Sequence, residues 1–296
     1  LMNLRLLLAA ALPLIAAIGS DASGQGSNFR ESAAAINSTI RANHYHRAQL
    51  DSEAYRQIER EVTALGENAT KADDFMSGFK AIWSKGPFSH VGLQKAQGSA
   101  ADRIARLDTL IVGPDAVKLA WQGTTAILTV NTMTGADTIR AIDAAYGEIG
   151  ARKAEKLIID LRRNDGGAFA VVPLIGHLID HPIDTGVFVG GPWYADHQRP
   201  PGPEDLRSAT PWRGYSVRAF QADVLTRPLT SYHIDPMQPR FGGPVFVLTS
   251  ARSISAAEIA ADALKLIGKL AVNSVAKFPV DMAKQFVAVN YDGYVI

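Results

Sequence analysis

The stretch "LIIDLRRNDGG", Leu157–Gly167, joins an apolar run to a loop that ends in two glycines. The apolar half, residues 157–161, is typical of a strand that is buried on both faces of a sheet. Paired glycines at the end of a strand let backbone amides approach a ligand without interference from a Cβ atom. Asn, Asp and Gly also suit an ordinary strand-to-helix turn. Taken alone, the stretch leaves a binding loop and a plain turn both open.

Strand and helix patterns alternate on both sides of this stretch. Residues 116–133 read as two strands around a Gln122-Gly123 turn, and further strands are "GVFVGG" at 186–191 and "GPVFVLTS" at 243–250. Helical patterns occupy residues 136–150 and 168–180. The alternation predicts an α/β core. We expect this core at residues 101–296.

Two other regions have a different character. In residues 23–100, apolar side chains recur at three- and four-residue steps, which predicts an N-terminal helical region. Residues 190–241 hold eight of the fifteen prolines and few apolar runs, so we expect a long irregular excursion there. Such an excursion is either a lid over a site or a surface decoration.

Composition excludes several classes of protein. The chain has 30 basic and 29 acidic residues and a formal net charge of +1, which gives no electrostatic case for a nucleic-acid or anionic-membrane partner. Hydrophobic residues at 47% and charged residues at 20% fit a globular protein. The absence of cysteine from the sequence excludes disulfides, cysteine catalysis and thiolate metal sites. No metal or organic cofactor is implied.

The N-terminus predicts a signal peptide over residues 1–22. A short positive segment, residues 2–5, precedes an apolar run of 13 residues, Leu6–Ile18, and Ser20-Asp21-Ala22 resembles a cleavage site. The run is short for a membrane span, although an uncleaved anchor is the alternative. We expect a periplasmic or secreted protein without a membrane span after signal cleavage.

A second informative stretch is "TSARSISAAEIAADAL", Thr249–Leu264, where a strand passes into helix formers. Ser255-Ala256-Ala257-Glu258 predicts a capping box, in which the Ser255 hydroxyl bonds the Glu258 amide and the Glu258 carboxylate bonds the Ser255 amide. The same position places a serine oxygen at the donor-rich end of a helix, where an oxyanion can be stabilised. These residues alone leave Ser255 open as a cap or a nucleophile.

The two stretches together resemble the serine peptidases of the carboxy-terminal processing and tricorn type. The resemblance covers residues 116–270. It matches a D-L-R-x-N-x-G-G strand end and an S-A-x-E helix start, which here are Asp160, Leu161, Arg162, Asn164, Gly166 and Gly167, then Ser255, Ala256 and Glu258. It implies a crotonase-like (Clp protease-like) core of strand-strand-helix units and a peptide or protein substrate.

The resemblance also assigns roles to individual residues. Ser255 is expected to attack the scissile carbonyl, and the amides of Gly167 and Ala256 are expected to hold the oxyanion. Asp160 and Arg162 are expected to brace the end of the strand. The predicted function is therefore an exported serine peptidase that forms an acyl-enzyme. A non-catalytic ligand-binding module on the same fold is the alternative.

The general base has two candidates within this family resemblance. The processing branch uses a lysine 25 residues after the serine, a position that Val280 occupies, and Lys277 is near but out of register. The tricorn-like branch uses a histidine preceded by a serine, which Ser89-His90 supplies. The space between His90 and the core has no room for a PDZ domain. We expect His90 as base and Ser89 as its orienting group, with Lys277 as the alternative.

The fourth member of the tricorn-type site, a late glutamate, has no evident match. The sequence ends 41 residues after Ser255, in "FVAVNYDGYVI", which looks like the middle of a strand. We therefore expect a truncation at the C-terminus, with the glutamate beyond residue 296. Nothing in the sequence predicts the oligomeric state.

Overall fold

The structure is a computed structural model that describes residues 29–44, 47–88, 91–93, 100–266, 290–291 and 294–295. The predicted signal peptide lies outside these residues. In the described part of the chain, no helix combines the length and the apolar character that a membrane span needs. Residues 290–291 and 294–295 form a short hairpin, β8 (Asn290–Tyr291) with β9 (Tyr294–Val295).

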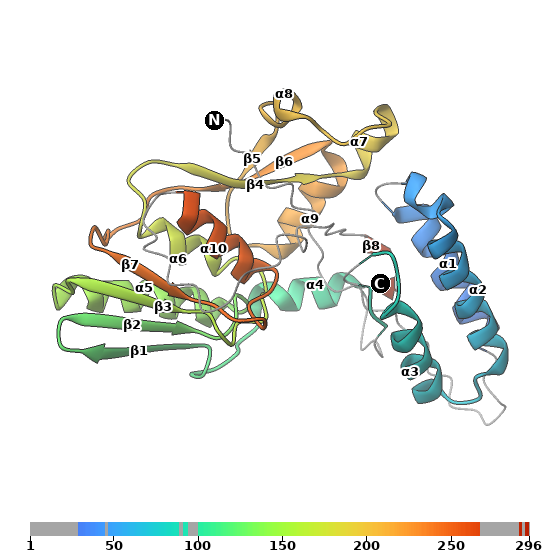
Figure 1. Cartoon of the computed structure of the whole chain (residues 1–296), viewed down its shortest axis with the longest axis horizontal. Coiled ribbons are helices and arrows are strands. Elements are labelled where there is room, and N and C mark those ends of the chain that lie inside the picture. Colours follow the sequence, from blue (N-terminus) through green and yellow to red (C-terminus); the bar gives the residue numbers. More distant parts are fainter. Residues whose placement is uncertain are drawn as a thin grey trace.

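The N-terminal helical region is confirmed. Its elements are α1 (Arg30–Asn43), the short 3-10 helix η1 (Arg47–Asp51), α2 (Glu53–Asn68) and α3 (Ala72–Trp83). They bury one apolar face each against a common cluster that is separate from the core of the α/β region. Figure 1 shows the helices α1, α2 and α3 together at one end of the molecule. In α2 this face consists of Tyr55, Ile58 and Val62, whose spacing of three and four residues puts them on one side of the helix.

The centre of the α/β region is a four-stranded sheet in the order β1-β2-β3-β7. Strand β1 runs antiparallel to β2, whereas β2, β3 and β7 are parallel to one another. The apolar run of the opening stretch forms β3, in which Leu157 and Ile159 are fully buried on one face and Ile158, on the other face, is only half-buried. The prediction of a strand that is buried on both faces is therefore wrong, because only one face of this sheet is fully covered. The strand bounds are β1 (Val117–Gln122), β2 (Thr125–Val130), β3 (Lys156–Asp160) and β7 (Val245–Leu248).

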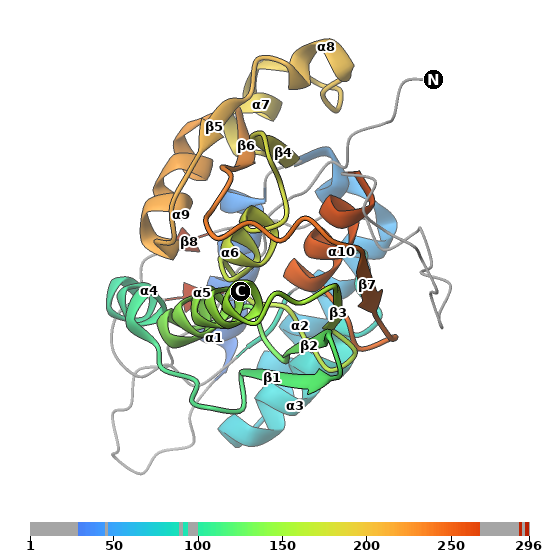
Figure 2. The same ribbon diagram turned by 90° about the vertical axis from the view of Figure 1, so that its left-hand side faces the viewer.

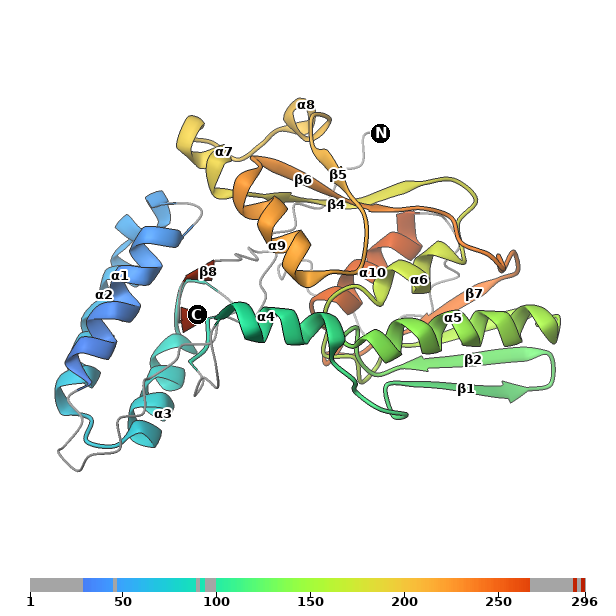
Figure 3. The ribbon, with the colours of Figure 1, turned by 180° about the vertical axis from the view of Figure 1, so that it is seen from behind.

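A helix follows each of the three parallel strands: α5 (Ala136–Ala151) after β2, α6 (Val171–Gly176) after β3 and α10 (Ala256–Leu266) after β7. The strand-helix units have the crotonase-like, Clp protease-like arrangement that the sequence predicted. Helix α6 is shorter than the predicted 168–180, because it ends at Gly176 and because residues 168–170 turn against the loop after β2, where the amides of Ala168 and Ala170 donate to the Met133 carbonyl oxygen. In all three ribbon views, α6 and α10 lie between the four-stranded sheet and a second sheet (Figures 1, 2 and 3).

The expectation of an irregular excursion at residues 190–241 is wrong. This segment contains α7 (Gly191–Asp196), α8 (Pro203–Leu206), β5 (Thr210–Trp212), α9 (Val217–Thr226) and β6 (Leu229–Ile234). Together with β4 (Ile183–Val189), its strands form a sheet in the order β4-β6-β5. The prolines fit these elements, because two of them open α7 and α8 and Pro211 lies on the edge strand β5.

The second sheet and α9 enclose an aromatic cluster. The ring centroid of Phe220 on α9 lies 4.9 Å from that of Trp212, 4.8 Å from that of Phe188 and 6.5 Å from that of Tyr232, and each of these pairs is edge to face. Helix α4 (Ala100–Thr109) packs beside α9. This cluster gives residues 190–241 a buried interior of their own.

Parallel strands bring their carboxyl ends to one edge of a sheet, and ligands of α/β proteins commonly bind at that edge. In this chain the loops that leave β2, β3 and β7 there are residues 131–135, 161–170 and 249–255. The glycine-rich loop of the opening stretch and Ser255 therefore meet, although they are far apart in the sequence.

Candidate active site

Ser255 forms the turn between the loop after β7 and helix α10. Its backbone φ is 57°, in the left-handed region, and Lys153 is the other non-glycine residue of the described chain with a positive φ. Such a conformation costs a non-glycine residue on the order of 1–3 kcal/mol and persists where the surrounding structure enforces it, often at active sites.

The predicted capping box is only half formed. The Ser255 amide donates to a Glu258 carboxylate oxygen at 2.7 Å, as expected. The Glu258 amide, however, donates to the Ser255 carbonyl oxygen at 2.8 Å, so the hydroxyl cap is wrong. An N-cap side chain needs an extended backbone to reach the amide three residues on, and the left-handed φ of Ser255 removes that geometry. Among the described residues the hydroxyl has no hydrogen-bond partner, and Ser255 lines a pocket.

The loop after β3 requires glycine at two positions, both because the backbone φ angles are positive and because neighbouring atoms leave no room for a Cβ atom. Gly166 has a φ of 93° and Gly167 a φ of 137°. A Cβ atom on Gly166 would lie 2.7 Å from the Ser255 Cβ, and one on Gly167 would lie 2.3 Å from the Thr134 side-chain oxygen. The loop is therefore held between Ser255 on one side and the loop after β2 on the other.

Two backbone amides beside Ser255 have no hydrogen-bond acceptor within the described part of the chain: those of Gly167 and Ala256. The amides of Gly166 and Ala168, on either side of Gly167, both donate to protein acceptors. Free amides next to a nucleophile are the donors that stabilise a developing oxyanion. These are the same two amides that the family resemblance assigned to this role.

Asn164 links the three parts of the site. Its side chain is fully buried; its amide nitrogen donates to the Val130 carbonyl oxygen at 3.0 Å, and its side-chain oxygen accepts from the Gly166 amide at 2.9 Å. Its backbone carbonyl oxygen accepts from the Ile254 amide at 3.2 Å, directly before Ser255. One residue thus fixes the end of β2, the glycine loop and the turn at Ser255 relative to one another.

Serine side chains fasten the loop after β7 to the loop after β3. The Ser250 hydroxyl donates to the Arg162 carbonyl oxygen at 2.6 Å, and the buried Ser253 hydroxyl donates to the Leu161 carbonyl oxygen at 2.7 Å. Arg162 in turn donates two hydrogen bonds to the Asp160 carboxylate, at 2.9 and 2.7 Å, which hold the pKa of Asp160 below its usual value. Asp160 and Arg162 brace the strand end as the sequence predicted.

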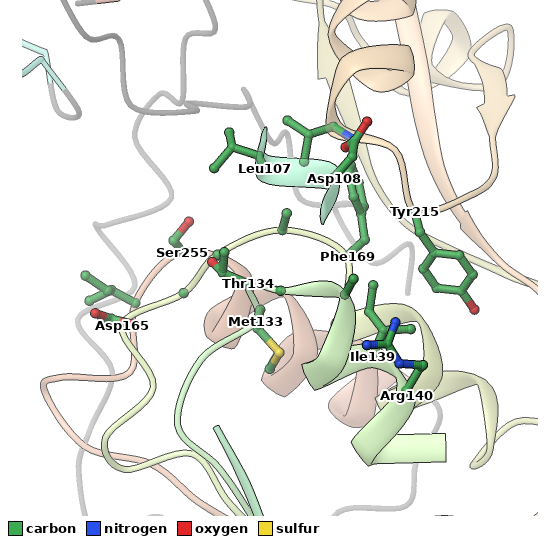
Figure 4. A pocket seen from close by; sticks show the side chains of 17 residues that line it. Leu107, Asp108, Met133, Thr134, Ile139, Arg140, Asp165, Phe169, Tyr215 and Ser255 are labelled. Carbon is green, nitrogen blue, oxygen red and sulfur yellow. The ribbon is translucent and has the colours of Figure 1, made fainter. Parts of the chain in front are cut away.

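The three loops and two further segments enclose a pocket of about 510 Å³ (Figure 4). Ser255 and the glycine loop, which includes Asp165, form one side of it. Much of the remaining wall is apolar and includes Leu107, Met133, Ile139, Phe169 and Val217. The volume lies within the range of about 300–1,000 Å³ that is typical of small-ligand sites, and it can accept one or two substrate side chains.

Glu258 is the titratable group that contacts Ser255 directly. Burial, the largest cause, raises the pKa of Glu258; the hydrogen bond from the Ser255 amide lowers it, and the neighbouring Asp262 carboxylate raises it. Burial also raises the pKa of Asp262. Helix α10 therefore carries two acids, Glu258 in its first turn and Asp262 near its middle, whose ionised forms are disfavoured relative to water.

The proposed bases, His90 with Ser89 and the alternative Lys277, lie outside the described residues. Within them, no histidine lines the pocket. His177 is buried and bonds Asp143 at 3.0 Å, and His233 bonds Asp184 at 2.9 Å, so both are engaged in structural contacts. Across the described ranges, no three His, Asp or Glu side chains form a group that could hold a metal ion.

Sequence reasoning did not find part of the pocket wall. Arg140 comes from α5 and Tyr215 from the loop before α9, and neither belongs to a motif. Asn164 was identified only as a motif position, without its linking role. A buried asparagine between a strand end and paired glycines is the signal that could have indicated that role.

The chain was compared with known proteins. The family model "Peptidase family S41" matches residues 124–272. A sequence search of curated proteins found no match. Among solved structures, a peptidase candidate from Parabacteroides merdae aligns at 14% identity and a TM-score of 0.47, over 82% of this chain and 74% of that one.

Two further structures are similarly remote. A lipoprotein from Streptococcus agalactiae aligns at 13% identity and a TM-score of 0.44, over 86% of this chain and 78% of that one. A photosystem II D1 C-terminal processing protease aligns at 12% identity and a TM-score of 0.43, over 82% of this chain and 80% of that one. The family match spans half of the chain and includes the glycine loop and Ser255. The chain belongs to peptidase family S41.

Proposed function

We propose that this S41 peptidase is an exported serine peptidase that cleaves peptide bonds through an acyl-enzyme on Ser255. One observation carries the proposal. Ser255 has a left-handed backbone that withdraws its hydroxyl from the helix cap, and it lines the same pocket as Gly167. A serine used only as a cap would keep its hydroxyl on the Glu258 amide.

In the proposed reaction, the Ser255 oxygen attacks the scissile carbonyl carbon and its proton passes to the general base. The carbonyl oxygen becomes an oxyanion that accepts hydrogen bonds from the amides of Gly167 and Ala256, each worth on the order of 3 kcal/mol. The C–N bond then breaks, and the base returns the proton to the leaving amine. Water attacks the acyl-enzyme in the same way and releases Ser255.

We assign the base to His90, oriented by Ser89, on the resemblance to the tricorn-like branch. A neutral imidazole accepts the proton, so kcat/KM is expected to rise through a pKa near about 6.5 and then level off. A lysine base must be deprotonated, and an ordinary lysine pKa of about 10.4 has to be lowered by burial before it can act near neutrality.

Kinetics of three variants test the proposal in the full-length protein. Ser255→Ala is expected to lower kcat by several orders of magnitude. His90→Ala is expected to remove activity, and Lys277→Ala to leave most of it. An active His90→Ala protein together with an inactive Lys277→Ala protein would overturn the tricorn-like assignment. An active Ser255→Ala protein would reject Ser255 as the nucleophile.

Export rests on the predicted signal peptide at residues 1–22. In a Gram-negative host the mature protein is expected in the periplasmic fraction, with an N-terminus near Ser23. Intact chain in the membrane fraction would favour an uncleaved anchor instead.

A further inference from the structure

The pocket beside Ser255 has two chemically different ends. Figure 4 shows Ser255 and Asp165 on one side of it, and Arg140 and Tyr215 on the other. Arg140 is an exposed residue of α5, and within the described ranges its guanidinium has neither an ion-pair partner nor a hydrogen-bond acceptor. A cation without a partner in the wall of a substrate pocket is available to a ligand.

Three acidic side chains around this end are already engaged. Asp137, one turn before Arg140 on α5, accepts from the Val112 and Gly113 amides. The Asp108 carboxylate, which also lines the pocket, accepts from the Ser216 hydroxyl at 2.7 Å and from the Val217 amide at 2.5 Å. Asp143, one turn after Arg140 on α5, bonds His177 at 3.0 Å. None of these three carboxylates forms an ion pair with Arg140.

The neighbouring groups suit a carboxylate of the ligand. A guanidinium presents a planar fork of donors that matches the two oxygens of a carboxylate. Burial, followed by the Asp143 carboxylate, raises the pKa of Tyr215, so its hydroxyl remains a donor at neutral pH. It donates to the Met237 sulfur at 3.9 Å, a long bond that a ligand carboxylate would replace. Between Arg140 and Ser255 the wall consists of the apolar Met133, Ile139 and Phe169 together with Thr134, and its apolar part fits the aliphatic part of a side chain.

We propose that Arg140, assisted by Tyr215, is a specificity-determining residue that binds a carboxylate of the peptide substrate, close to the scissile bond. The carboxylate belongs either to an acidic side chain or to the C-terminus of the peptide. This inference rests on the proposed function, because it places the scissile carbonyl at Ser255. It defines the preferred substrate as a peptide with an apolar stem and a negative end near the cleaved bond.

Cleavage of matched peptides by the full-length protein tests the inference. One set carries Glu or Gln at each of three positions on either side of the cleaved bond, and a second set ends near that bond in a free carboxylate or an amide. At one of the tested positions, the peptide that carries the carboxylate is expected to have a kcat/KM about tenfold higher than its uncharged partner. A factor of this size corresponds to one charge-assisted hydrogen bond. The set in which this ratio appears identifies the source of the carboxylate. The ratio should decrease as salt is added.

Variants assign the ratio to Arg140. Arg140→Gln is expected to bring the Glu-to-Gln ratio close to one, and Arg140→Glu is expected to favour the corresponding Lys peptide. Arg218→Gln, which changes an exposed arginine of α9 that is not part of the pocket, should retain the wild-type ratio. Because each ratio compares two substrates of the same preparation, a partly unfolded variant still gives a valid result.

The outcomes separate the two proposals. If the wild-type protein cleaves none of the peptides, and Ser255→Ala does not differ from it on a protein substrate, the proposed function fails. If the wild-type protein cleaves the peptides without preferring the acidic members, the role of Arg140 is wrong and the proposed function stands. A preference that survives in Arg140→Gln also overturns the role of Arg140.

Discussion

The α-carbon of Gly166 lies against the side chain of Ser255, so closely that a Cβ atom on Gly166 would be 2.7 Å from the Ser255 Cβ and 3.2 Å from its hydroxyl oxygen. This contact joins the loop after β3 to the turn before α10. It brings the proposed oxyanion donors to the proposed nucleophile, and it makes the geometry of the site depend on the absence of a side chain at one position.

Replacement of Gly166 with alanine tests this contact. The added Cβ must displace Ser255 or the glycine loop, so kcat/KM is expected to fall at least about 100-fold, the loss typical of a displaced oxyanion donor. Gly113→Ala is a matched control, because Gly113 has a φ of 101° and a Cβ there would meet nothing within 4 Å. Both variants should lose about 1–3 kcal/mol of stability from the backbone alone.

Thermal unfolding and peptide cleavage, measured on both proteins, separate the two effects. Gly113→Ala should retain nearly wild-type activity per folded molecule. Equal loss of activity in the two variants would show that the strained backbone, and not the contact with Ser255, determines the effect.

The sequence predicted those parts of the site that are formed by residues adjacent in the chain. The apolar run of β3, its terminal glycines and the helix start at Ser255 are contiguous patterns, and each was found where it was expected. That the two loops lie side by side was inferred from a family resemblance. No local sequence pattern predicts such a contact, because the contacting residues, for example Ser250 and Arg162, are 88 residues apart.

Three features could not be predicted. The hydroxyl of Ser255 is absent from the cap because the backbone φ is positive, and that angle is set by packing against Gly166. The elements within residues 190–241 are only 3 to 10 residues long, too short for a clear period. Arg140 and Tyr215 share a pocket only because α5 and the loop before α9 pack at the same edge.

Asn164 is expected to act as a positioning residue, through the glycine loop and the turn before Ser255. Asn164→Ala leaves the Gly166 amide and the Val130 carbonyl oxygen without their partners. A small displacement of the loop should lower kcat about 100-fold and leave KM within a few fold. Stability should also fall by about 1–3 kcal/mol.

Asn37→Ala serves as its control, because the buried Asn37 side chain also makes two hydrogen bonds, to the Glu59 carbonyl oxygen and the Thr63 hydroxyl at 3.1 Å each, in the N-terminal helical region. Steady-state kinetics should show a kcat loss for Asn164→Ala alone. If kcat per folded molecule is unchanged in Asn164→Ala, the residue has a purely structural role.

The two serines at 253 and 255 should differ in their effect on stability. Ser253 is buried, donates to the Leu161 carbonyl oxygen at 2.7 Å and accepts from the Ser250 amide at 3.0 Å, so Ser253→Ala is expected to cost about 1–3 kcal/mol. Ser255→Ala removes a hydroxyl that caps nothing and should change stability by less than about 0.5 kcal/mol. Chemical denaturation measures both. A larger loss for Ser255→Ala than for Ser253→Ala would place the Ser255 hydroxyl in a structural hydrogen bond.

The raised pKa of Glu258 predicts the direction of a pH effect on stability. Above the unfolded value of 4.5, the folded state holds the Glu258 proton more tightly than the unfolded state does, so the free energy of unfolding decreases as pH rises through the folded pKa. Glu258→Gln removes this dependence. The stability of the wild-type protein relative to Glu258→Gln should therefore fall with increasing pH above about 4.5.

Denaturation between pH 4 and 8 provides the comparison, with Glu67→Gln, an exposed position at the end of α2, measured in parallel as a matched substitution away from Ser255. If the relative stability of the wild-type protein instead rises with pH, the hydrogen bond from the Ser255 amide outweighs burial and the pKa of Glu258 is lowered.

The central claim is that Ser255 is a nucleophile, and covalent labelling tests it most directly. The full-length protein is treated with a serine-directed fluorophosphonate, and the modified residue is located by peptide mass spectrometry. We predict one adduct, on Ser255, with labelling and peptidase activity lost in parallel in Ser255→Ala and both retained in the exposed control Glu67→Gln. An enzyme that cleaves peptides while Ser255 stays unmodified, or an adduct on Ser250 or Ser253, would contradict the account.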